Sequence, residues 1–102
     1  MATTPEGRAK AKIKTYLKSI EDCWFFMPIG GPYSVQGIPD IVGCISGRFF
    51  AIEVKAPGKE NNTTELQKMQ INGICEVGGI AFVASDVETV RRNFKEWNID
   101  VP

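Results

Sequence analysis

Two β-rich segments joined by Ser46-Gly47 constrain the fold of this chain more than any other feature. Residues 40–45 and 48–55 are rich in isoleucine, valine and phenylalanine, which favour strands. A Ser-Gly pair between two such segments is typical of a tight hairpin turn. With this turn, pairing continued outward brings Asp40 directly opposite Glu53. Opposite residues of an antiparallel pair point to one face, so the sequence predicts Cβ atoms roughly 4.5–5.5 Å apart.

The predicted pair of carboxylates needs a compensating charge. Two carboxylates at this separation repel by roughly 3 kcal/mol at an effective dielectric constant near 20. The rest of the hairpin is apolar on both faces, so we expect it to be buried between helices. The acidic face carries Val42, Phe49 and Ala51, and the other face carries Ile41, Phe50 and Ile52. A divalent cation is the natural compensation, because Mg²⁺ binds one or two carboxylates and leaves positions for water and phosphate.

Lys55 joins the acidic face through the alternation of side chains along a strand. Hydrolysis of a phosphodiester needs an activated water, a metal that polarises the phosphoryl oxygens and a cation for the developing charge. The pattern therefore indicates a hydrolytic centre. The alternative is a structural Asp-Glu-Lys salt-bridge cluster at a sheet end, which is the more common explanation of such a pattern in isolation.

Histidine is absent from the chain, which excludes several classes of enzyme. Ser-His-Asp and Cys-His systems, histidine-metal nucleases and ordinary zinc hydrolases all need an imidazole. The cysteines are widely spaced and form no Cys-x-x-Cys pair, so we interpret them as reduced, buried residues: Cys23, Cys44 and Cys75. The sequence shows no apolar signal region and no apolar stretch of membrane-spanning length, so we expect a cytoplasmic protein without a membrane partner, in a phage or bacterial cell.

The remaining elements surround the hairpin in a simple order. Apolar spacing predicts helices over residues 6–19 and from residue 64 to about 77, where Thr64 and Gln67 fit a capping box. A second capping pattern over residues 85–88 predicts a last helix. We expect strands at 23–27 and 80–84, and one side of the middle helix formed by Leu66, Met69, Ile74 and Val77. The sequence predicts one α/β domain over residues 1–102, with a mixed sheet flanked by helices.

Charge is distributed unevenly, although the chain has a net charge of zero. Residues 1–20 hold five basic residues against one acidic residue, whereas residues 60–102 hold four basic and seven acidic residues. Lys10, Lys14 and Lys18 lie four residues apart, on one stripe of the first predicted helix. This stripe suits the binding of phosphate, and on charge alone a plain solvated helix face explains it equally well.

The sequence around the hairpin resembles a known family. Gly37-Ile38-Pro39-Asp40, then Ile52-Glu53-Val54-Lys55-Ala56-Pro57, then Gln67-Lys68 on a helix ending at Gly78-Gly79, is similar to the virus-type replication-repair nuclease (VRR-NUC) domain. That domain belongs to the restriction-endonuclease-like superfamily, also called PD-(D/E)XK. The resemblance covers residues 6–88 and implies an αβββαβ core with a mixed central sheet.

The resemblance also implies roles for particular residues. Asp40, Glu53 and the backbone carbonyl of Val54 would bind Mg²⁺ or Mn²⁺, and Lys55 would orient the attacking water. Gln67 matches a helix glutamine near the site.

Glu6 matches an acidic metal-site residue on the first helix. Glu21 competes with it for this role, and a favourable charge in the first helical turn explains Glu6 equally well.

A stand-alone domain of this kind resembles small phage-type nucleases that cut branched DNA, such as Holliday junctions, as homodimers. The resemblance therefore implies a metal-dependent DNA endonuclease, and a two-fold dimer would offer two symmetric sites. The alternatives are a nucleic-acid-binding module of the same fold without catalysis and a purely structural scaffold.

The glycine-rich segment 30–37 lacks a phosphate-cradling fingerprint. We expect it to border the substrate groove, with possible phosphate donors in Tyr33, Ser34 and Gln36. An aromatic cluster could stack bases, but a core strand or dimer contact is the better interpretation of Trp24, Phe25, Phe26 and Tyr33.

Overall fold

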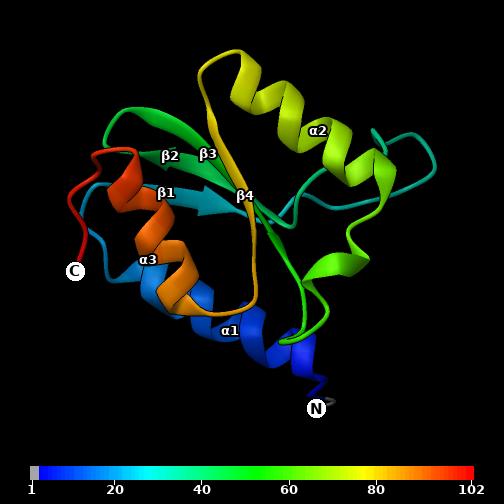
Figure 1. Ribbon diagram of the computed structural model, residues 1–102, viewed down its shortest axis with the longest axis horizontal. Coiled ribbons are helices and arrows are strands. Elements are labelled where there is room, and N and C mark those ends of the chain that lie inside the picture. Colours follow the sequence, from blue (N-terminus) through cyan, green and yellow to red (C-terminus); the bar gives the residue numbers. More distant parts are fainter. Residues whose placement is uncertain (1–2) are drawn as a thin grey trace.

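The computed structural model describes residues 3–102 and contains one four-stranded sheet between helices (Figure 1). The elements in chain order are α1 (Pro5–Lys18), β1 (Cys23–Phe26), β2 (Ile41–Ile45), β3 (Arg48–Val54), a 3₁₀ turn (Glu60–Asn62), α2 (Glu65–Glu76), β4 (Ile80–Ala84) and α3 (Val87–Glu96). The strand order is β1-β2-β3-β4, with antiparallel pairs except for the parallel pair β3–β4. The predicted fold class is confirmed.

The β2–β3 hairpin has the predicted turn and register. Ser46 and Gly47 both have positive φ, at 49° and 82°, which suits a tight two-residue turn. Ile45 pairs with Arg48, and the paired residues end at Ile41 and Ile52. Residue 40 therefore lies just outside β2, whereas the prediction began the strand there.

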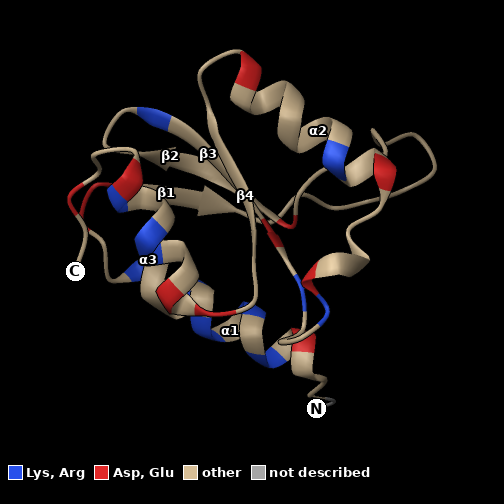
Figure 2. Ribbon diagram, in the orientation of Figure 1, with Lys and Arg blue, Asp and Glu red and all other residues tan. Residues whose placement is uncertain are grey.

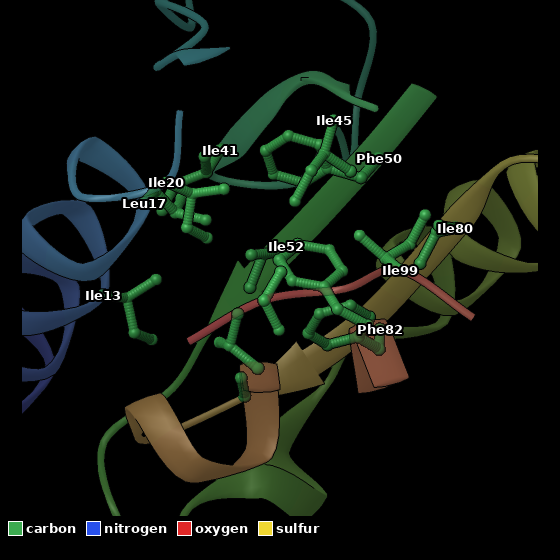
Figure 3. Close-up of a cluster of buried hydrophobic side chains, with 14 of the residues drawn as sticks. Ile13, Leu17, Ile20, Ile41, Ile45, Phe50, Ile52, Ile80, Phe82 and Ile99 are labelled. Carbon is green, nitrogen blue, oxygen red and sulfur yellow. The ribbon is translucent and has the colours of Figure 1, made fainter. Parts of the chain in front are cut away.

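The larger core lies between the sheet and helices α1 and α3 (Figure 3). Ile13 and Leu17 of α1 meet Ile52 of β3, and all three are fully buried. Phe94 of α3 packs edge-on against Phe50 and Phe82, with ring centroids 5.4 and 5.9 Å apart. Burying a side chain of this size stabilises the fold by roughly 1.5–3 kcal/mol.

The opposite face of the sheet is only partly covered, by α2. Its buried cluster consists of Val42, Ala51 and Ala81, against which α2 packs Ile71, Ile74 and Cys75. The sheet row formed by Trp24, Cys44 and Phe49 stays exposed on this face. The prediction of three buried cysteines was therefore wrong: Cys44 is exposed, and Cys23 and Cys75 are only partly buried. All three are free.

The predicted apolar side of α2 also needs correction. Only Ile74 of the predicted set packs against the sheet, whereas Leu66, Met69 and Val77 are 47%, 57% and 87% exposed. Compared with the predicted orientation, the helix is rotated about its axis. The rotation turns Gln67 toward the sheet, where the Gln67 amide donates to Glu53.

Helix starts follow local hydrogen bonds. Thr64 and Gln67 form the predicted capping box of α2. The N-cap of α3 is Asp86 and not the predicted Ser85, whose hydroxyl donates to Glu60 instead. Among the described residues, no helix has both the length and the apolar character needed to span a membrane.

Candidate active site

Four of the predicted site residues come together at one end of the sheet. Asp40 precedes β2, Glu53 lies near the end of β3, Lys55 follows β3, and Gln67 lies in the first turn of α2. The hairpin register brings the two carboxylates together, and the capping box fixes the start of α2 above them. Acidic and basic positions meet at this end of β3 in Figure 2.

Glu53 is the central buried charge of the site, with 4% of its surface exposed. Its Oε2 accepts a hydrogen bond from Gln67 Nε2 at 3.0 Å and lies 3.5 Å from Lys55 Nζ. Burial, reinforced by the charge of Asp40, raises the pKa of Glu53 to about 7, although Lys55 opposes this shift. The carboxylate pair is therefore incompletely neutralised by the surrounding side chains.

Asp40 is held by groups from two other elements. Its Oδ2 accepts the backbone N–H of Val54 at 2.9 Å, which replaces a ladder hydrogen bond just beyond β2. Its Oδ1 lies 3.5 Å from Lys10 Nζ, and Lys10 is also 4.0 Å from Glu6. The contact between Lys10 and Asp40 was not predicted. The only local signal was the spacing of Glu6 and Lys10, which suits a helical ion pair.

Gln67 links the helix cap to the charged groups. Its Oε1 accepts the backbone N–H of Thr64 at 2.9 Å and the Lys55 ammonium at 3.1 Å. Its Nε2 is thereby aimed at Glu53. One amide therefore begins α2 and holds both Lys55 and Glu53.

The donor set suits a hard divalent cation. Asp40 and Glu53 provide two carboxylates whose mutual repulsion a cation would relieve. Within residues 3–102, no three His, Cys, Asp or Glu side chains form a group that could hold a metal, so backbone or water oxygens would have to complete the shell. Glu6 reaches this pair through Lys10, and its side chain is 48% exposed.

The predicted lysine stripe begins at the site. Lys10 is engaged with carboxylates, whereas among residues 3–102 Lys14 and Lys18 enter no ion pair. Lys14 is half-buried and Lys18 is exposed. Basic positions recur along α1 in Figure 2. The stripe thus leads away from Asp40 along the helix.

The segment between β1 and β2 borders the site. A cavity of about 350 Å³ is lined by residues 28–31 and 34–40 and ends at Asp40. Tyr33 is fully exposed. Ser34 bonds within the segment, to Gly31, and the carbonyl of Gln36 accepts Gln70 Nε2.

The aromatic cluster divides between core and surface. Phe25 packs against the larger core, as the interpretation of a core strand requires. Trp24 and Phe26 remain 66% and 49% exposed, with ring centroids 5.6 Å apart.

Comparison with known proteins identifies the fold. A scan against protein-family models and a search of curated proteins found no match. A solved structure described as a VRR_NUC domain matches over 93% of this chain and 99% of the other, with a TM-score of 0.70 and 21% sequence identity. The chain therefore has the VRR-NUC fold, which is a nuclease-type fold.

Proposed function

We propose that this protein is a Mg²⁺- or Mn²⁺-dependent DNA endonuclease that hydrolyses phosphodiester bonds. The observation that carries the proposal is the buried Glu53 beside Asp40, with Lys55 and Gln67 in contact with it. A cluster kept only for stability would gain little from burying Glu53 beside the half-buried Asp40, because desolvation of a charge usually costs more than its ion pairs return.

The residues divide the work of hydrolysis between them. Asp40 and Glu53 bind the cation, with the carbonyl of Val54 as a further ligand. When bound, the cation supplies the charge that polarises the phosphoryl oxygens. Lys55, held 3.1 Å from Gln67 Oε1, orients the attacking water and faces the developing negative charge. Glu6 lies at the edge of the site, where its carboxylate is 4.0 Å from the ammonium of Lys10.

DNA would approach along the lysine stripe of α1. Lys14 and Lys18 offer charges for phosphates, and Lys10, which lies 3.5 Å from Asp40, would add a third if a cation neutralised that carboxylate. Ser34 and Gln36 offer polar groups on the wall that leads to Asp40. Phosphate contacts of this kind position DNA without selecting its sequence.

A homodimer on branched DNA such as a Holliday junction is the form that we propose. The exposed face formed by Trp24, Phe26 and Phe49 beside Val77 of α2 would be the contact between copies. Obligate interfaces commonly bury more than about 2,000 Å² and are apolar. Sedimentation should then give twice the mass of the 11.3 kDa monomer, and Trp24→Glu should give the monomer.

A cleavage panel tests the activity. Single-stranded, duplex, flap and four-way-junction DNA are incubated with wild-type protein, Asp40→Asn or Glu53→Gln, with and without Mg²⁺ or Mn²⁺. We expect cation-dependent cutting, strongest on the junction, by wild-type protein alone. Full cutting by either variant would refute the site. Binding of every substrate without cutting would favour an inactive DNA-binding module, and a cytoplasmic location in a phage-infected or bacterial cell suits both functions.

A further inference from the structure

The segment between β1 and β2 exposes apolar side chains at its tip. Tyr33 is 100% exposed, Ile29 is 93% exposed and Val35 is 63% exposed. Figure 1 shows this segment, in teal, extending beyond the N-terminal end of α2. Apolar side chains gathered on a protruding segment mark a contact with another molecule more often than scattered ones do.

The base of this segment is fixed to the body of the protein. Gly37 has a φ of +80°, and a Cβ there would lie 2.5 Å from the backbone oxygen of Leu66. The backbone of residue 37 is therefore pressed against the first turn of α2. Gln70 Nε2 donates to the carbonyl of Gln36 at 3.2 Å, and Pro39 is fully buried.

The tip itself is organised by a turn. The N–H and hydroxyl of Ser34 both bond to the carbonyl of Gly31, at 3.1 and 2.7 Å. The same hydroxyl oxygen accepts the N–H of Gly31 at 2.9 Å. Tyr33 stands within this turn and has no ring partner among the described residues. Tyr33 therefore exposes its aromatic ring on a turn whose segment is fixed to the body of the protein at residues 36–39.

The segment and the site share one cavity. Its lining includes Ile29 and Val35 of the tip as well as Asp40 of the site, whereas Tyr33 lies outside it. Residues 28–39 contain no lysine or arginine, so attraction for phosphate does not explain the tip. What the tip offers is ring and apolar surface, which suits the face of a nucleobase.

We propose that Tyr33, flanked in the sequence by Ile29 and Val35, stacks on an unpaired base of a DNA strand that is bound at Asp40 and Glu53. The inference rests on the proposed function and defines its substrate class. In a continuous duplex both faces of a base are covered by its neighbours, so a free face exists only at branch points, flaps, gaps or single strands. The tip therefore selects DNA in which stacking is interrupted beside the scissile bond.

The test measures binding, with Asp40→Asn as the background so that DNA stays intact. Two DNAs of equal length are compared, a continuous duplex and a branched DNA that carries 2-aminopurine at the unpaired position. The added variants are Tyr33→Ala, Tyr33→Phe and, as an exposed apolar control outside both the tip and the proposed dimer contact, Met69→Ala. Because Tyr33 is fully exposed, its replacement leaves the fold intact.

We expect the 2-aminopurine fluorescence to be quenched on binding whenever residue 33 is aromatic. Tyr33→Ala should abolish the quenching and weaken binding to the branched DNA by about 5-fold to 150-fold, the range expected for loss of one stacked base. Binding to the duplex should not change, and Tyr33→Phe and Met69→Ala should behave as the background protein does.

Other results overturn the inference. If Tyr33→Ala weakens binding to both DNAs equally, the tip is a general DNA contact. If Tyr33→Ala changes neither binding nor fluorescence, the tip does not contact DNA. Conversion of the Tyr33→Ala variant to a smaller species in sedimentation would make it a contact between copies. If the background protein binds neither DNA, the proposed function fails as well, which separates that failure from those of the tip alone.

Discussion

Helices α1 and α3 cover one face of the sheet, and α2 covers part of the other, so the two faces differ in what they bury. Under α1 and α3, residues such as Ile13, Phe50 and Phe94 are fully buried. Under α2 the buried apolar cluster contains only Val42, Ala51 and Ala81, and Glu53 is buried beyond its end. The first face holds the domain together, whereas the second leaves room for charge and for other molecules.

The largest expected difference between the faces is in stability. Phe94→Ala removes a ring that packs against Phe50 and Phe82, so the free energy of unfolding should fall by about 3–5 kcal/mol. The matched change on the other face is Trp24→Ala, which removes a ring that is 66% exposed and should cost under about 1 kcal/mol. Urea unfolding of both variants at a concentration that keeps the protein monomeric measures the two losses. Similar losses of stability in Phe94→Ala and Trp24→Ala would contradict the conclusion that the two faces contribute differently to stability.

Glu53 makes the stability of the protein depend on pH, whereas the apolar residues of the first face do not. Burial and the charge of Asp40 raise the pKa of Glu53 to about 7 in the folded protein. Between about pH 4.5 and pH 7, the folded protein therefore keeps a proton on Glu53 that the unfolded protein has lost. The free energy of unfolding of metal-free protein should therefore fall as the pH rises through this range, by about 3 kcal/mol in total. Glu53→Gln should remove this fall, so that the variant is the more stable protein at pH 8 and equals wild type at pH 4.

Urea unfolding at a series of pH values checks this prediction. Glu76→Gln, at the exposed C-terminal end of α2, is the control and should retain the wild-type pH dependence. Adding Mn²⁺ at pH 8 should stabilise wild type and not Glu53→Gln. A stability difference between Glu53→Gln and wild type that does not vary with pH would refute the assignment.

Removing either of two helix caps should lower the free energy of unfolding by the same amount, although the two helices lie on opposite faces of the sheet. Thr64→Ala removes the cap of α2, and Asp86→Ala removes the cap of α3. Each should lower the free energy of unfolding by about 1 kcal/mol. Only Thr64→Ala should also weaken Mn²⁺ binding and cleavage, because Gln67 bonds to residue 64. Urea unfolding measures the stability of both variants, calorimetry measures their affinity for Mn²⁺, and cleavage assays measure their activity. Equal losses of activity in the two variants would contradict the role of Gln67.

The smallest effect concerns Lys10, which lies 3.5 Å from Asp40. A cation that binds Asp40 has to displace or repel this ammonium, so Lys10→Met should bind Mn²⁺ a few-fold more tightly than wild type. Lys14→Met, one turn further along α1, is the control and should change the affinity less. Calorimetric titration distinguishes the two, and weaker binding by Lys10→Met would mean that Lys10 supports the site instead of competing for it.

Local sequence signals predicted the hairpin and much of the site. The Ser46-Gly47 turn sufficed to predict the register of the hairpin, which ends at the pair Ile41–Ile52 directly before Asp40 and Glu53, because the register of a tight hairpin depends on neighbouring residues alone. The capping box at Thr64 was equally local. The bonds that Gln67 makes to Lys55 and Glu53 depend on how α2 crosses the sheet, which the resemblance indicated and the spacing did not.

The wrong predictions share a tertiary cause. The apolar side of α2 was misplaced because periodicity finds an apolar stripe and does not reveal whether the stripe meets the sheet or solvent. Ser85 fits a helix cap in isolation, yet Glu60 takes its hydroxyl and Asp86 becomes the cap. The contact between Lys10 and Asp40 was missed for the same reason, because it depends on the packing of α1 against β1 and β3. The predicted role of Lys10 in binding DNA stays a prediction.

For the proposed nuclease, Gln67 would make the local unfolding of one helical turn equivalent to inactivation. Its side chain closes the first turn of α2 and holds Lys55 and Glu53, so any excursion in which that turn opens also releases both groups. Terminal turns open far more often than whole domains unfold. The equilibrium between the closed and the open turn therefore limits the fraction of molecules in which Gln67 holds Lys55 and Glu53, and amide hydrogen exchange at residues 67 and 68 would report that fraction directly.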